Sequence, residues 1–288
     1  MRVRELVDEC REQWGLRLGE PYAPGAVGFA VRAELGDGTP VVLKLTPPDR
    51  ESEHEADALE LWDGDGAVRL LARDDERGAL LLERCEPGTS LTAAGQEAAL
   101  DVLVSLLPRL WKPAGAPFHT LEDEAAYWIE LLRARGGELD AVAARLLEEL
   151  APTQGEHVLV HQDLHAANVL AAQREPWLAI DPKPLVGERE FAAAPIVRSF
   201  ELGHGRRDVI HRLDRLSSEL GLDRERVRGW TIGQTVTWSS GSYYVAAHIE
   251  TYRGGVLQDE SRALFERYEP RMLDWLDDRV VRHRQPPD

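Results

Sequence analysis

Three side chains that carry oxygen atoms suited to chemistry lie in one short stretch, residues 157–183. They are Asp163, Asn168 and Asp181. Asn168 precedes one apolar run and Asp181 ends another, with a polar turn between the runs. This pattern predicts a hairpin that brings Asn168 and Asp181 to one end of a strand pair. Amide and carboxylate oxygens suit Mg²⁺, a hard cation that also binds phosphates, so the pair predicts a metal site.

Asp163 lies just upstream, in the polar loop after the apolar run 157–160. There it is placed to accept a proton from an attacking hydroxyl. A base, an amide ligand and a carboxylate ligand are the groups that phosphoryl transfer needs, because the protein mainly positions the nucleophile and neutralises phosphate charge. The alternative is that Asn168 only caps a turn. Against it, Asn168 is the only asparagine in the chain, so a specific geometry is favoured.

The spacing H-x-D-x-x-x-x-N, followed by an aspartate at a strand end, resembles the catalytic loop of the kinase superfamily. The specific form HQDLHAANVL with AIDPKP is similar to the aminoglycoside phosphotransferase family, and within it to the streptomycin 6-kinase and hydroxyurea phosphotransferase branch. Two departures are visible. The family usually has Gly in place of Gln162 and Pro-Gly in place of Ala166-Ala167. Neither replaces a reactive group, so they bear on loop shape and acceptor fit.

The resemblance implies an α+β, two-lobed protein-kinase-like fold. Residues 1–86 would form a small antiparallel β lobe with helices that binds the nucleotide, and residues 87–288 a larger, mainly helical lobe for catalysis and acceptor binding. The implied activity is transfer of the γ-phosphate of ATP, with Mg²⁺, to a hydroxyl of a small molecule. An aminoglycoside such as streptomycin is the first expectation, and hydroxyurea or another hydroxylated metabolite is the alternative.

Two hypotheses that assign no catalytic activity of this kind stay open at this point. One is a nucleotide-binding pseudokinase that no longer catalyses. The other is an unrelated fold in which Asp163, Asn168 and Asp181 only cap loops. Within the kinase reading, the resemblance implies that Asp163 is the catalytic base and that Asn168 and Asp181 hold the metal.

Lys44 stands inside the apolar run 41–45, where an unpaired cation is costly. Lysine is rare in this chain, and the acidic stretch 49–62 that follows is predicted to be a helix whose candidate partners for the lysine are Glu51, Glu55 and Glu60. The resemblance selects Glu55 as the partner, because His-Glu-Ala-Asp-Ala-Leu matches the same branch, and implies that Lys44 contacts the α- and β-phosphates. The alternative is a lysine at an exposed strand position.

The resemblance also implies a hinge between the lobes near Glu83 and Cys85, whose backbone groups would read the edge of adenine. Pro87-Gly88 marks the lobe boundary. The two cysteines, Cys10 and Cys85, lie far apart and show no metal or redox spacing, which favours buried thiols. Lys183 is open to three readings: it approaches the phosphates, supports the Asp181 loop or makes a structural ion pair.

The composition is that of a soluble globular protein, with 43% hydrophobic and 30% charged residues among 288. A net charge of −17 argues against nucleic acid and anionic membranes as partners, since both bind basic patches. It is compatible with a cationic small-molecule acceptor, although an acidic bias for solubility explains it equally well. The N-terminus lacks the apolar core of a signal peptide, and no apolar run approaches about 20 residues, so we expect a cytoplasmic protein.

Apolar periodicity and turn signals predict the remaining elements. We expect helices at 2–14, through 92–150 with a break at 113–117, and at 207–220, 224–247 and 259–281. We expect strands between 16 and 34 with a turn at Pro24–Gly28, at 41–45, 67–73, 78–83 and 157–160. In the 224–247 helix, Trp230, Trp238, Tyr243 and Tyr244 read as a core stripe, and a wall of the acceptor site is the alternative.

Overall fold

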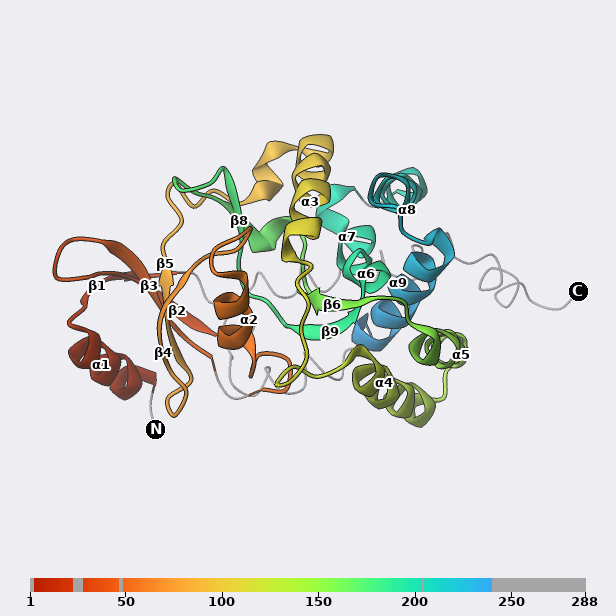
Figure 1. The fold of residues 1–288 in the computed structure, drawn as a ribbon, viewed down its shortest axis with the longest axis horizontal. Helices are drawn as coiled ribbons and strands as arrows, with labels where there is room; N and C mark the ends of the chain where they lie inside the picture. The colour runs from red at the N-terminus through yellow and green to blue at the C-terminus, as the bar shows by residue number, and fades with distance from the viewer. Residues whose placement is uncertain (1–2, 23–27, 47–48, 204, 240–288) are drawn as a thin grey trace, which may run out of the picture. The chain divides into compact units, whose positions relative to one another are not determined.

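The computed structural model describes residues 3–22, 28–46, 49–203 and 205–239 (Figure 1). The chain divides into two compact units. The first unit comprises residues 1–91 together with 168–184, and the second comprises 92–167 together with 185–288. An antiparallel sheet with helices in the first unit and mainly helices in the second confirm the predicted α+β class. The lobe boundary at residues 86 and 87 stays a prediction.

The first unit is built on an antiparallel sheet whose strand order, in the described part of the chain, is β1-β2-β3-β5-β4. Its strands and helices are α1 (Val3–Trp14), β1 (Arg17–Pro21), β2 (Phe29–Glu34), β3 (Pro40–Leu45), α2 (Glu55–Trp62), β4 (Leu70–Asp74) and β5 (Ala79–Glu83). The predicted strands are all present. Residues 23–27 of the predicted turn at Pro24–Gly28 lie outside the described residues.

A tight turn connects β2 to β3, as the Gly-Asp-Gly-Thr sequence predicts. The Leu35 N–H donates to the Thr39 carbonyl at 3.0 Å, and Asp37 accepts from the Thr39 N–H at 2.9 Å. Gly38 adopts a φ of 89°, which only glycine takes without strain. The turn fixes the register of the two strands, which pairs Ala30 with Lys44.

One face of the sheet forms the core of the first unit together with α1. Buried residues of the core include Cys10 from α1 and Val41, Leu43 and Leu45 from β3. Because side chains alternate along a strand, burying these three residues sends Lys44 to the opposite face of the sheet. The lysine is therefore kept out of the apolar core while its strand is held firmly by that core.

Helix α2 begins at Glu55, six residues later than predicted. The stretch before it is a turn. Asp49 accepts hydrogen bonds from the Glu51 N–H through its side chain, at 2.9 Å, and from the Glu53 N–H through its carbonyl, at 2.9 Å. A short acidic side chain that bonds its own backbone competes with the helix. The predicted helix was therefore wrong over residues 49–54 and right over 55–62.

A hairpin from later in the chain completes the first unit. It consists of β7 (Val169–Ala171) and β8 (Trp177–Ala179), paired antiparallel and preceded by the 3₁₀ turn η3 (Ala166–Asn168). Backbone hydrogen bonds tie the two strands to the segment just before β4 and to the segment after β5. The Val68 N–H donates to Ala179 at 3.0 Å, and the Ala171 N–H donates to Thr89 at 2.9 Å. The hairpin that carries Asn168 and Asp181 is thus integrated into the first unit.

The second unit is mainly helical (Figure 1). Its elements are α3 (Gln96–Leu110), α4 (Leu121–Arg135), α5 (Glu138–Leu150), η2 (Ala151–Thr153), β6 (His157–Val160), β9 (Leu185–Glu188), α6 (Arg189–Ala192), α7 (Ala194–Arg198), η4 (Phe200–Leu202), α8 (Arg206–Leu220) and α9 (Arg224–Ser239); η1 (Leu91–Ala94) precedes α3. Strands β6 and β9 pair antiparallel. Strand β9 was not predicted.

Helix α9 packs closely on α5 because two glycines face it. A Cβ on Gly233 would lie 2.5 Å from the Leu147 side chain, and one on Gly229 would lie 2.7 Å from Leu150. Trp230 of α9 is fully buried, with its ring 5.5 Å from that of Phe191. The prediction that Trp230 belongs to the core is therefore confirmed.

Three predictions for the last part of the chain fall wholly or partly beyond the described residues: the end of the helix at 224–247, the helix at 259–281, and Tyr243 and Tyr244. Within the part of the chain that the structure describes, we find no helix long and apolar enough to cross a membrane.

Candidate active site

Lys44, Glu55 and Asp181 come together in the first unit. The Lys44 ammonium donates to both oxygens of Glu55, at 2.6 and 2.7 Å, and to Asp181 Oδ1 at 2.5 Å. Glu55 is buried in the first turn of α2, whereas the Asp181 side chain is 54% exposed. The predicted contact between Lys44 and Glu55 is present, and a carboxylate from 137 positions further along the chain joins it.

Burial and charge act in opposite directions on this pair. Burial by itself lowers the pKa of Lys44, but the charges and hydrogen bonds of Glu55 and Asp181 outweigh it and hold the pKa well above its usual range. Burial also raises the pKa of Glu55, which Lys44 opposes. The ammonium is therefore a fixed positive charge at neutral pH, as a group that binds phosphate must be.

The β7–β8 hairpin brings Asn168 and Asp181 to the same end of the strand pair, as predicted. The Ile180 N–H donates to the Asn168 carbonyl at 2.9 Å, which aligns the residues on either side of the two strands. Asp181 has a φ of 55°, a conformation in which Asp and Asn are tolerated better than most residues. The same end of the strand pair thus carries a half-exposed carboxylate and an amide side chain, two kinds of oxygen donor that fit Mg²⁺.

Lys183 makes an ion pair within the same unit. Its ammonium lies 3.3 Å from Glu51 Oε2, and both side chains are largely buried. Glu51 belongs to the turn before α2, so this pair joins that turn to the loop after Asp181. Of the three readings of Lys183, the contact favours support of the Asp181 loop by a structural ion pair.

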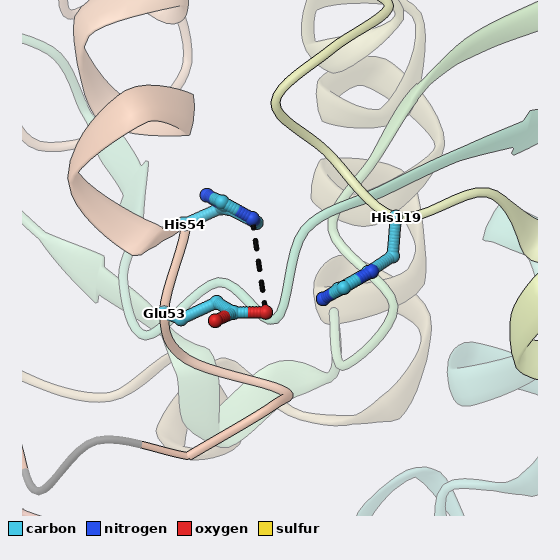
Figure 2. Close-up of side chains that lie close together, drawn as sticks. All are labelled: Glu53, His54 and His119. Atoms are coloured by element: carbon cyan, nitrogen blue, oxygen red, sulfur yellow. Dashed lines mark ion pairs between the residues drawn. The ribbon is translucent and has the colours of Figure 1, made fainter.

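The turn before α2 carries further charged groups beside Glu55. Glu53 and His54 form an ion pair at 3.7 Å (Figure 2), and His54 Nδ1 lies 2.9 Å from Asp57. The third side chain drawn in Figure 2, His119, belongs to the second unit. His54 is thus held by acidic neighbours on its own segment.

The predicted hinge residues are Glu83 and Cys85. The Glu83 carboxylate accepts from Arg174 in the β7–β8 turn, at 2.9 Å, and Arg174 also donates to the carbonyls of Gly64 and Ala67 at 2.8 and 2.9 Å. Arg174 therefore joins the end of β5 to the β7–β8 hairpin. Nothing in the sequence singled out Arg174, because arginine is abundant in this chain.

Cys85 is buried, as expected for a structural thiol. Burial, with the nearby charge of Glu83, raises the pKa of Cys85 to about 12. A thiol with so high a pKa is unreactive at neutral pH. Any contact of Cys85 with a nucleotide would therefore come from its backbone groups, as the family resemblance implies.

Asp163 lies in the second unit, in a loop with unusual backbone geometry. The Asp163 N–H donates to the His161 carbonyl at 2.8 Å, which closes a three-residue turn around Gln162. Gln162 has a φ of 61°. Such turns are strained for a residue with a side chain, which explains why the family usually has Gly there. The Gln162 carbonyl accepts from Gln234 of α9 at 3.0 Å, which helps hold the turn in place.

Sequence reasoning gave no role to His165, Arg198 or Glu201, which lie near Asp163 or beside its neighbour His165. His165 Nε2 lies 3.9 Å and Arg198 Nη2 lies 3.7 Å from Asp163 Oδ1. Glu201 lies 3.1 Å from His165 Nδ1. Burial lowers the pKa of His165, but the hydrogen bond to Glu201 and the charges of Asp163 and Glu201 outweigh it, so that the pKa is raised. The apolar surroundings of Arg198 and Glu201 in the sequence gave no signal of this role.

Comparison with protein families supplies a clear match. The family model described as aminoglycoside/hydroxyurea antibiotic resistance kinase matches residues 25–244. The chain is 42% identical to a hydroxyurea phosphotransferase of Kitasatospora aureofaciens, over 80% of this chain and 70% of that protein. It is 38% identical to a streptomycin 6-kinase of Streptomyces glaucescens, over 80% and 79%.

Solved structures agree on the fold. A choline kinase from Streptococcus pneumoniae superposes with a TM-score of 0.64 at 14% identity, over 92% of this chain and 98% of that one. A thermostable mutant of aminoglycoside phosphotransferase APH(4)-Ia, in a complex with ADP and hygromycin B, gives 0.62 at 13% identity, over 97% and 99%. These similarities confirm the predicted kinase-like fold.

Proposed function

The chain belongs to the aminoglycoside/hydroxyurea antibiotic resistance kinases, and from that premise we propose that it transfers the γ-phosphate of ATP to a hydroxyl of streptomycin or a closely similar aminoglycoside. Membership makes it an ATP-dependent small-molecule kinase. The roles of single residues, the metal and the acceptor are parts of the proposal. The observation that carries the proposal is that the Lys44 ammonium donates to the carboxylates of both Glu55 and Asp181.

Each residue has one role in the proposed reaction. Lys44, held by Glu55, binds the α- and β-phosphates of ATP. Asp163 orients the acceptor hydroxyl and takes its proton. The acceptor oxygen forms a bond to the γ-phosphorus while the bond between that phosphorus and the bridging oxygen breaks, and ADP leaves. Backbone groups near Glu83 and Cys85 read the adenine edge.

Asn168 and Asp181 would hold Mg²⁺, which supplies positive charge to neutralise the phosphates. Both side chains end in oxygen donors at one end of the hairpin. Asp181 also accepts from Lys44, so its carboxylate is oriented before any nucleotide binds. Preorganised charge of this kind lowers the cost of reaching the transition state.

The acceptor class follows from the relatives and from charge. Streptomycin carries guanidinium groups, which pair well with carboxylates, and a protein with a net charge of −17 attracts cations. Hydroxyurea is the second candidate, because a hydroxyurea phosphotransferase is 42% identical to this chain. The cytoplasmic location expected from the sequence remains a prediction.

The test is ATP consumption by the purified protein with Mg²⁺, measured against streptomycin, other aminoglycosides, hydroxyurea and simple sugars. Turnover that depends on streptomycin, with kcat/KM falling as salt rises, supports a cationic acceptor, because salt screens long-range attraction. Turnover with hydroxyurea alone, without that salt dependence, supports the second candidate. Binding of Mg·ATP without turnover on any acceptor would contradict the proposed activity and favour a pseudokinase.

A further inference from the structure

The carboxylate of Glu201, 36 positions after His165 in the chain, holds the loop that carries Asp163. Glu201 accepts from His165 Nδ1, with both carboxylate oxygens at 3.1 Å, and from the Ala167 N–H at 3.1 Å. The Ser199 hydroxyl adds a longer contact at 3.5 Å. The side chain of Glu201 is 13% exposed, so these bonds lie mostly out of water. Glu201 therefore spans the loop on both sides of Ala166.

His165 lies between this carboxylate and Asp163. Its Nδ1 is hydrogen-bonded to Glu201, and its Nε2 lies 3.9 Å from Asp163 Oδ1. The second distance is too long for a hydrogen bond but short enough for attraction between charges. Because Glu201 bonds one ring nitrogen, it fixes which nitrogen faces Asp163, and a protonated imidazole is stabilised between the two acids.

Arg198 approaches the same oxygen of Asp163, at 3.7 Å. Its guanidinium stacks over the Trp238 ring, 4.6 Å from the centroid, which limits its orientations. Arg198 and Glu201 lie on one short segment, so two side chains from that segment reach the loop. Oδ1 of Asp163 thus faces two nitrogen groups, one from His165 and one from Arg198.

The segment itself is held by a buried arginine of α8. Arg212 is 1% exposed, and its guanidinium donates to the carbonyls of Val197, Leu202 and Gly203 at 2.9, 2.5 and 2.9 Å. A rigid planar donor that satisfies several carbonyls at once suits this task. The backbone on either side of Glu201 is therefore fixed independently of the loop.

We propose that Glu201 is a positioning residue for the proposed base Asp163, acting through His165 and the Ala167 amide. The inference rests on the proposed function, since it gives Asp163 the role of base. Glu201 contacts neither phosphate nor acceptor in this scheme. It sets the place and charge of His165, which in turn orients Asp163, and displacement of a catalytic group by about 1 Å can cost about 10²-fold in rate.

The test begins with Glu201→Gln, which removes the charge and keeps the shape. We expect kcat to fall on the order of 10- to 100-fold while KM for ATP stays near wild type. If Glu201 acts through His165, the double variant with His165→Gln loses little more than His165→Gln alone. Glu148→Gln is the matched control, because Glu148 makes an exposed ion pair with Arg133 in the same unit. Wild-type kcat in Glu201→Gln, or losses that multiply in the double variant, would overturn the proposal.

A second measurement does not depend on activity. Nitrogen-15 NMR of the histidine rings follows the titration of His165, whose signals are those missing in His165→Gln. We expect Glu201→Gln to lower the pKa of His165, and an unchanged pKa would refute the contact. The two proposals can fail separately. If wild type turns over no acceptor, and Glu201→Gln still lowers the pKa of His165, the proposed function is refuted while the contact between Glu201 and His165 stands.

Discussion

The ammonium of Lys44 donates to both carboxylate oxygens of Glu55, at 2.6 and 2.7 Å, across the first unit from strand β3 to helix α2. Glu55 is 2% exposed, and a charge so deeply buried is tolerated only with a partner. The apolar neighbours of Lys44 in β3 pack into the core on the other face of the sheet. The pair is therefore held by packing as well as by charge.

Replacing Glu55 by Gln should destabilise the protein, because Lys44 loses its buried partner. Since Lys44 keeps Asp181, we expect a loss of about 1–3 kcal/mol in the free energy of unfolding rather than the cost of an unpaired buried charge. Urea unfolding measures it. Glu34→Gln is the control, because Glu34 pairs with Arg17 on the surface and such pairs contribute only about 0–1 kcal/mol. Equal losses of unfolding free energy in Glu55→Gln and Glu34→Gln would show that Glu55 is not the buried partner that stabilises Lys44.

Asp181→Asn should weaken binding of Mg·ATP by at least about 10-fold, as expected for loss of a metal ligand. Asparagine tolerates the positive φ of this position, so the change tests charge rather than backbone strain. Calorimetric titration with Mg·ATP, and with ATP in EDTA, separates metal from nucleotide binding. Asp63→Asn, at another aspartate with positive φ, should bind as wild type does. Equal affinity of wild type and Asp181→Asn for Mg·ATP would argue against metal ligation.

Asp163→Asn should lower kcat by roughly 10²- to 10⁴-fold, the range for loss of a general base, with ATP affinity near wild type. Steady-state kinetics with the acceptor found in the panel, together with ATP titration, measure both quantities. Asp214→Asn removes an aspartate from an exposed ion pair with Arg224 and should keep full activity. Full activity in Asp163→Asn would show that another group takes the proton.

The raised pKa of His165 makes its contribution to stability depend on pH. Burial opposes its charged form, and so does the charge of Arg198, but the hydrogen bond to Glu201 and the charges of Asp163 and Glu201 outweigh both, so that the pKa of His165 is raised. The stabilising contribution is therefore fully present below about pH 6.5, the unfolded-state value, and is lost as pH rises through the raised folded-state pKa. The free energy of unfolding of wild type should exceed that of His165→Gln by the largest amount below about pH 6.5. The difference between the two proteins should shrink as the pH rises above that value. A difference that grew with pH would contradict this sign.

Arg174→Lys should destabilise the first unit, because lysine cannot bond Glu83 and the carbonyls of Gly64 and Ala67 together. We expect a loss of about 1–3 kcal/mol, the cost of leaving buried acceptors unsatisfied, seen as a lower urea midpoint. Arg17→Lys, at an exposed pair with Glu34, should change the midpoint little. Similar midpoints for both variants would mean that Arg174 does not hold the hairpin.

The strands of the first unit and the hairpin with Asn168 and Asp181 could be expected from sequence. Alternating apolar residues and turn residues act over a few positions, so local patterns report them directly. The pairing of Lys44 with Glu55 was expected from the family resemblance, and the structure shows the contact. The motif at 161–168 also carried enough specific residues to identify the family. The start of helix α2 was misjudged because the Asp49 side chain bonds its own backbone, a choice that composition alone does not reveal.

Other features depended on contacts between distant parts of the chain. Arg174 meets Glu83 from 91 positions away, and Asp181 meets Lys44 from 137. Arginine and glutamate are common here, and an abundant residue type gives no signal of which pair will meet. Side-chain partners of this kind are chosen by the packing of whole elements. Local sequence therefore determined the motif and its family, and the tertiary structure decided which charges, Glu201 among them, hold that motif in place.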